Sequence, residues 1–115
     1  MNELTPDDCE KFDGYVKKWQ RILNLSDWRI ERGAKRAKKS MAEVSFDDAA
    51  RLATYRIGMS FGAAPVTDFN LEQTALHEVL HVFLHELLEA DTQSLEGAEH
   101  RVINLLEKLL MGRHD

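Results

Sequence analysis

The sequence predicts a single α+β domain, and three observations support this prediction. Near both ends of the chain, apolar residues recur at three- and four-residue steps, as they do along one face of a helix. Between these regions, three short segments alternate apolar and polar residues, which is typical of half-buried strands. A length of 115 residues and a hydrophobic content of 43% fit one globular domain over residues 1–115.

The first helix is expected to begin after Thr5 and to run to about Leu25. Thr5 is a candidate N-cap, Pro6 suits the first helical position, and Asp7 and Asp8 favour the positive end of the helix dipole. An apolar stripe follows, which indicates a face packed on the core or, alternatively, a helix that docks in a partner's groove. The stripe consists of Phe12, Tyr15, Val16, Trp19, Ile22 and Leu23.

Three strands are expected, over residues 28–32, 42–46 and 51–59, and they predict a small mixed sheet of three to four strands. Asp47 and Asp48 indicate a turn between the second and the third. The second strand would place Ala42, Val44 and Phe46 on one face. The third would do the same with Ala53, Tyr55, Ile57 and Met59.

The segment between the first two strands is basic. Residues 33–40 hold Lys35, Arg36, Lys38 and Lys39 and no acidic residue. This segment is either a solvated hairpin loop or a basic rim that attracts an acidic substrate or a nucleic-acid phosphate. It is short and has no interleaved aromatic residues, so it is a weak indication of nucleic-acid binding.

Two more helices are expected in the second half of the chain. Residues 71–90 form a long segment without Gly or Pro that is apolar on several sides, which predicts a buried helix. Asn70 is a candidate N-cap, and Gln73 would complete a capping box. Ser94 can cap a last helix over residues 95–111.

The buried helix carries the pattern His-Glu-x-x-His at residues 77–81. On a helix, His77 and His81 lie one turn apart on the same face, so both imidazoles can bind one metal ion. Glu78 is turned by about 100° from His77, beside the metal, where it can act as a general base toward an activated water. This pattern is the helical zinc signature of metalloproteases and predicts a Zn²⁺ site.

Glu99 is the candidate third metal ligand. On the expected last helix it falls inside the apolar stripe, whereas His100 falls outside. A carboxylate inside a buried stripe is costly unless it is paired or binds a metal. The alternative role for Glu99 is a buried ion pair with Arg56 or Arg101.

His85 is a weaker candidate ligand. It lies eight residues after His77, which is about 12 Å along a straight helix, and two zinc–nitrogen bonds of about 2 Å do not bridge that distance. We therefore expect His85 to support the site from outside the metal's ligands or to lie at the surface.

These residues resemble the gluzincin pattern of zinc metallopeptidases. Residues 82–98 separate the second histidine of the motif from Glu99, which is similar to the spacing in thermolysin-like and aminopeptidase members. The order of elements is also similar to small zincin-like proteins encoded by phages and prophages, in which a segment like 99–103 lies on the last helix. The resemblance implies a minimal zincin-like fold, with zinc held by His77, His81 and Glu99 and with Glu78 as the catalytic residue.

The resemblance also implies a zinc-dependent metallopeptidase that hydrolyses peptide bonds in a peptide or protein substrate. An exposed sheet edge would hold that substrate by strand addition, either at 51–59 or at 60–61. Larger gluzincins stabilise the oxyanion with a His or Tyr from a further domain, and Tyr55 or Arg56 are the candidates to replace that group in this chain. The alternatives are a catalytically weak or inactive zinc-binding domain used as a binding or regulatory module, and a helical interaction protein with an accidental motif.

Composition limits the environment and the partners. The formal charge of −5 does not favour a general nucleic-acid binder, and no apolar run is long enough to span a membrane. The N-terminus lacks the apolar core of a signal peptide, so we expect a cytoplasmic protein of a bacterial or phage-infected cell. Cys9 is the one cysteine, so no internal disulfide can form, and we expect it to be a packing residue or a surface thiol rather than a nucleophile.

Overall fold

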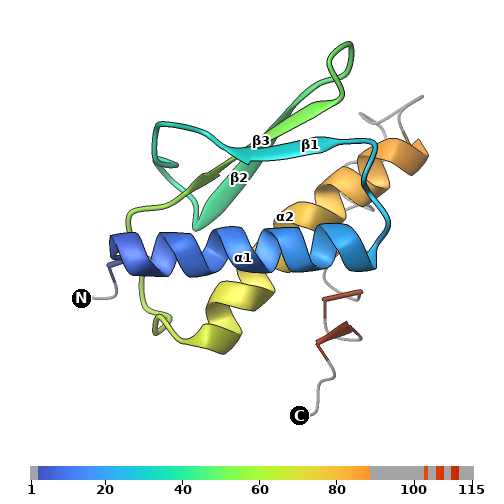
Figure 1. The fold of residues 1–115 in the computed structure, drawn as a ribbon. Coiled ribbons are helices and arrows are strands. Elements are labelled where there is room, and N and C mark those ends of the chain that lie inside the picture. The colour runs from blue at the N-terminus through green and yellow to red at the C-terminus, as the bar shows by residue number, and fades with distance from the viewer. Residues whose placement is uncertain (1–2, 89–102, 104–105, 108–109, 112–115) are drawn as a thin grey trace.

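The computed structural model describes residues 3–88, 103, 106–107 and 110–111 (Figure 1). The elements follow in the order α1 (Pro6–Ile22), β1 (Arg29–Arg32), β2 (Ala42–Asp47), β3 (Leu52–Ile57) and α2 (Asp68–Leu88). The residues at 103, 106, 107 and 110 are helical, but most of the expected last helix over 95–111, with Glu99, lies outside the described residues. The prediction of an α+β fold with an N-terminal helix and a small mixed sheet is confirmed. No helix in this described part of the chain is long and apolar enough to cross a membrane.

The sheet has the strand order β1-β3-β2, with β1 parallel and β2 antiparallel to β3. Two expectations are therefore wrong. The third strand is the centre of the sheet rather than a free edge, because it pairs on both sides. The basic segment after β1 is not a hairpin loop, because β1 and β2 are not neighbours and the chain must pass the end of β3 between them (Figure 1).

Helix α1 begins where the sequence predicts. The Thr5 hydroxyl accepts a hydrogen bond from the Asp8 main-chain nitrogen at 3.2 Å, and the Asp8 carboxylate accepts one from the Thr5 nitrogen at 2.9 Å. The helix ends at Ile22, earlier than expected, because Asn24 adopts a left-handed conformation with φ of 59°.

Helix α2 begins earlier than the predicted capping box. The Thr67 hydroxyl accepts a hydrogen bond from the Asn70 nitrogen at 3.0 Å, which makes Thr67 the capping residue. Asn70 and Gln73 lie inside the helix, so the predicted capping box is wrong. Their side chains point to other partners: Asn70 donates to the Pro65 carbonyl and Gln73 to the Glu107 carboxylate.

The core lies between the helices and one face of the sheet. Ala53, Tyr55 and Ile57 of β3 are buried on this face, as their alternation predicts, whereas Met59 beyond the strand is 61% exposed. Helix α1 packs on α2 and on β1, and α2 also contacts β2, so both helices lie on the same side of the sheet (Figure 1). The α1 residues that complete this core are Cys9, Phe12, Val16 and Trp19, which makes Cys9 a packing residue.

Candidate metal centre

Helix α2 is fixed by apolar contacts on most of its circumference, and this fixes the direction of its polar residues. The side chains of Leu76, Val79, Leu80 and Val82 are at most 1% exposed. A helix that is packed so tightly cannot rotate without opening the core. His77 and His81, which are one turn apart, and Glu78 are therefore held in fixed positions on a rigid helix.

The two histidines of the motif lie side by side. Their ring centroids are 5.0 Å apart and their planes are inclined by 66°. Two imidazoles bound to one tetrahedral zinc ion, with zinc–nitrogen bonds of about 2 Å, have ring centroids about 5 Å apart. The spacing of His77 and His81 thus fits a shared ion.

A carboxylate that the sequence did not indicate contacts the first histidine. Oε2 of Glu107 lies against Nδ1 of His77, and the other oxygen accepts a hydrogen bond from Nε2 of Gln73 at 3.3 Å. Only 9% of the Glu107 side chain is exposed. A carboxylate on one ring nitrogen of a histidine fixes the tautomer and leaves the lone pair on the other nitrogen for a metal. Glu107 lies where such an orienting group is expected.

Burial and charge act on His77 in opposite directions. Burial lowers the pKa of His77, but the hydrogen bond and the charge of Glu107, together with the charge of Glu78, raise the pKa by more. The net effect is a raised pKa, so a metal that binds to this imidazole must displace a proton.

Glu78 is a buried carboxylate with an unusual environment. It is 6% exposed and accepts no hydrogen bond from any residue that the structure describes. Burial raises its pKa to about 7, against the opposing charge of His77 and with the added repulsion of Glu107 and Glu43. An ionisable group kept in this state is costly for folding, and such groups concentrate at functional sites.

A cavity of about 340 Å³ opens beside these groups. His77, Glu78 and Glu107 line one part of it, and Asn70, Gln73 and Thr74 of the first turns of α2 line another. The remaining wall is apolar and comes from Met41, Ala42, Phe61 and Ala64. The cavity is large enough for a side chain of a substrate and has a proton acceptor, Glu78, at its wall.

The predicted third ligand, Glu99, lies outside the described residues. Among the residues that are described, no three His, Cys, Asp or Glu side chains form a group that could hold a metal ion. The predicted set of His77, His81 and Glu99 is thus brought together only for its two histidines.

The two candidate substitutes for an oxyanion-stabilising group are engaged elsewhere. The Tyr55 hydroxyl donates a hydrogen bond to the Asp13 carboxylate of α1 at 2.6 Å, and Tyr55 is 3% exposed. Burial and this contact raise the pKa of Tyr55. Arg56 forms an ion pair with Glu43 at 3.4 Å. Tyr55 therefore serves the packing of α1 on the sheet.

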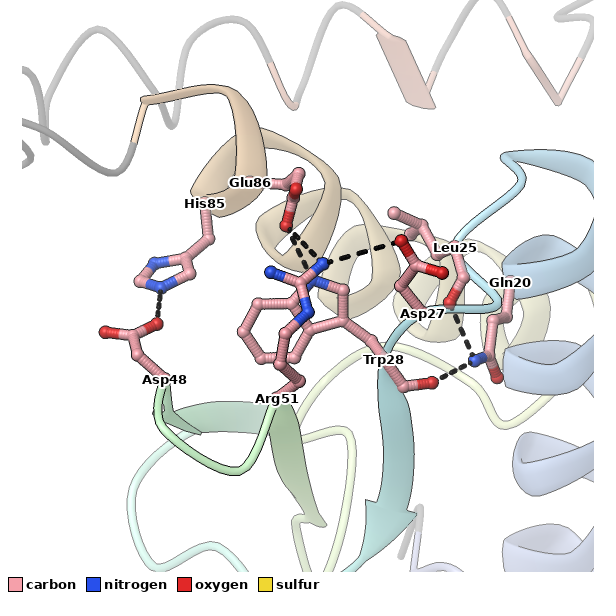
Figure 2. Close-up of polar contacts among 8 residues, drawn as sticks. All are labelled: Gln20, Leu25, Asp27, Trp28, Asp48, Arg51, His85 and Glu86. Atoms are coloured by element: carbon pink, nitrogen blue, oxygen red, sulfur yellow. Dashed lines mark hydrogen bonds and ion pairs between the residues drawn. The ribbon is translucent and has the colours of Figure 1, made fainter.

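His85 belongs to a separate network at the far end of α2 (Figure 2). Its ring is stacked on Phe46 with centroids 3.9 Å apart, and Nε2 lies 2.6 Å from Oδ1 of Asp48. The adjacent Glu86 accepts hydrogen bonds from Nε1 of Trp28 at 2.8 Å and from Arg51 at 3.0 Å (Figure 2). These contacts engage His85 with Phe46 and Asp48, away from the pair of His77 and His81.

Comparison of the chain with family models, with curated proteins and with solved structures gives no match.

Proposed function

We propose that the chain is a zinc-dependent metallopeptidase, with His77, His81 and Glu99 as the zinc ligands and Glu78 as the catalytic base. The observation that supports this proposal best is Glu78 itself. It is a buried carboxylate at the wall of a cavity, it accepts no hydrogen bond from the described residues, and it is adjacent to a histidine pair with the spacing of zinc ligands. A carboxylate that only stabilised the fold would be paired.

The donor set suits zinc. Two imidazoles and one carboxylate are the ligands of catalytic zinc sites that keep a fourth position open. Zinc in such a site polarises a carbonyl and lowers the pKa of a water molecule to about 7. Glu107, against Nδ1 of His77, would hold that imidazole in the tautomer that binds a metal through Nε2.

Glu78 would move the proton during hydrolysis. As a base it takes the proton of the attacking water, and as an acid it passes that proton to the leaving amine of the peptide. A pKa near the working pH suits a group that must do both, and burial beside the cavity keeps the transfer away from bulk water.

The edge strand β2 is the place where a peptide would dock. The Gly58 nitrogen donates to the Met41 carbonyl at 2.7 Å, so Met41 directs its main-chain carbonyl toward β3. In an antiparallel pair, successive residues direct their main-chain carbonyls alternately toward and away from the neighbouring strand. The carbonyls that point away from β3 are therefore those of Ala42, Val44 and Phe46. Ala42 also lines the cavity beside Glu78, so a strand added there would pass the catalytic base.

The test combines metal analysis with one substitution. The purified protein should contain close to one zinc per chain and should cleave members of a fluorogenic peptide library. Glu78→Gln should retain zinc and lose hydrolysis by a factor of at least about 100, which is the lower range for a general base.

Three results would contradict the proposal. Full activity of Glu78→Gln would show that Glu78 is not the base. Stoichiometric zinc with no cleavage of any peptide would favour the alternative of a zinc-binding module without turnover, and absence of zinc would favour an accidental motif.

A further inference from the structure

The basic segment between β1 and β2 is held in a fixed conformation across the end of β3. The Ala37 nitrogen donates to the Ile57 carbonyl at 3.0 Å, and Ala37 is 3% exposed. Arg36 donates from Nε to the same carbonyl at 3.0 Å and from Nη2 to the Gly58 carbonyl at 2.8 Å. This segment is therefore an ordered part of the fold.

Gly58 makes the close approach possible. A Cβ atom at this position would lie 2.3 Å from the Ser40 carbonyl oxygen and 3.0 Å from that of Met41. Any larger residue would push residues 40 and 41 away from β3. The glycine thus keeps the basic segment against the strand that precedes α2.

The fixed segment forms one wall of a second cavity, of about 340 Å³, which we call the basic cavity. Five of the 15 Lys and Arg residues of the chain line it, with one of its 20 Asp and Glu residues, Glu43. Glu43 is already paired with Arg56 at 3.4 Å. The cavity is therefore strongly positive on a chain whose net charge is −5. Its basic residues are Lys35, Arg36, Lys38, Lys39 and Arg56.

The basic cavity is adjacent to the cavity that contains Glu78. Ala42, the first residue of β2, lines the Glu78 cavity, and the next residue, Glu43, lines the basic one. Successive side chains of a strand point to opposite faces, so the two cavities lie on the two sides of the first residues of β2. An extended peptide beside β2 also directs alternate side chains to these two sides.

We propose that the basic cavity selects acidic substrates: an Asp or Glu located one to three residues from the cleaved bond would bind there. This inference rests on the proposed peptidase function and adds the substrate class to it. Lys35, Lys38 and Lys39 are exposed and can reach a carboxylate, while Arg36 is fixed by the main chain of β3. An acidic peptide fits better than a nucleic acid, because the cavity has no aromatic residue for base stacking.

The test compares matched peptides on the zinc-loaded full chain. A fluorogenic peptide that the protein cleaves is prepared with Glu at each position near the cleaved bond, and again with Gln in its place. At low salt, the best Glu peptide should show a kcat/KM about five- to tenfold higher than its Gln counterpart, as two exposed ion pairs can provide. The preference should shrink in 0.5 M NaCl, because salt screens exposed charges.

The variant Lys38→Glu/Lys39→Glu should abolish the preference for Glu while keeping cleavage of the Gln peptide. The control Lys17→Glu/Arg21→Glu reverses two exposed charges on α1 and should keep the preference. An unchanged preference in the first variant, or equal cleavage of both peptides by the parent, would overturn the inference and leave the peptidase proposal intact.

Binding measured by fluorescence anisotropy separates the two proposals. A labelled Glu-rich decapeptide should bind the unmodified protein more tightly than its Gln counterpart even if neither is cleaved, in which case the basic cavity stands and the peptidase function fails. A labelled single-stranded oligonucleotide that binds through Lys38 and Lys39 more tightly than the acidic peptide would overturn the inference in favour of nucleic acid.

Discussion

The middle and the C-terminal end of helix α2 each place a histidine against a carboxylate, but the surroundings of the two pairs differ. His77 contacts Glu107, whose side chain is 9% exposed, beside a cavity and the buried Glu78. His85 contacts Asp48, whose side chain is 70% exposed. A histidine–carboxylate pair is therefore not by itself a sign of function.

The two regions differ in whether their polar groups are bonded to one another. At the C-terminal end, His85 is stacked on Phe46. Trp28 donates a hydrogen bond to Glu86 (Figure 2), so the polar and aromatic groups there contact one another. In the middle of the helix, around His77, Glu78 is buried and accepts no hydrogen bond from the described residues. The contacts around His85 stabilise the fold, whereas burying Glu78 at a cavity without such a contact from the described residues costs stability.

The largest expected effect separates the two histidines by zinc binding. His77→Ala removes one of three proposed ligands, so we expect zinc affinity to fall by about a thousandfold, the share of one ligand in a typical zinc site. His85→Ala should leave the affinity within a few-fold of the parent. Competition with a fluorescent chelator measures the zinc affinity of both variants. A comparable loss of affinity in His85→Ala would contradict the different roles given to His77 and His85.

The second expected effect is a pH dependence of the metal-free protein. The pKa of Glu78 is raised from 4.5 to about 7, so its contribution to stability is full below pH 4.5 and is lost as the pH rises through 7. Replacement by Gln removes this penalty and should stabilise the metal-free protein by up to about 3 kcal/mol at pH 8, with no gain at pH 4. Urea unfolding in the presence of a chelator measures the difference.

Glu86, at the C-terminal end of α2, should show the opposite dependence of stability on pH. The hydrogen bond from Trp28 and the nearby Arg51 hold its pKa below the ordinary value, despite some burial. Its stabilisation is present above pH 4.5 and is lost as the pH falls through its lowered pKa. Glu86→Gln should therefore destabilise the protein at neutral pH. A gain of stability at pH 8 in this variant would contradict the different roles given to Glu78 and Glu86.

The third expected effect concerns the two carboxylates that contact histidines. Glu107→Gln weakens the group that orients His77, and we expect zinc affinity to fall about 10- to 100-fold, as for other groups that orient metal ligands. Asp48→Asn makes the same change at His85 and should leave zinc affinity unaltered. If Glu107→Gln bound zinc as the parent does, Glu107 would be only a packing partner of α2.

The sequence predicts local features of this fold better than contacts between distant residues. The Thr5 cap, the buried faces of β2 and β3 and the motif helix depend on residues close in sequence, and all are found. The start of α2 was misassigned because Thr67 and Asn70 can both cap a helix. The strand order depends on pairings between β1 and β3, which alternation does not specify.

The same limit applies to the site. The spacing of His77, Glu78 and His81 on one helix is sufficient to predict their proximity. Glu107 was missed because it lies at the margin of the apolar stripe of the expected last helix, and its partner His77 is 30 residues away. The sequence signal that could have indicated it is its position four residues after the apolar Ile103, on the same face of a helix. Glu99 remains a prediction.

The smallest expected effect is at the C-terminal end of α2, around His85. Phe46→Leu removes the stacking on His85 and the edge contact with Trp28, where the ring centroids are 5.9 Å apart. Such aromatic pairs contribute about 1 kcal/mol, so the unfolding midpoint in urea should fall modestly while zinc affinity stays constant. Phe69→Leu, at a residue that is 52% exposed, is the control and should change neither quantity. A loss of zinc in Phe46→Leu would mean that the packing of β2 on His85 also determines the geometry of the proposed metal site, because both lie on one rigid helix.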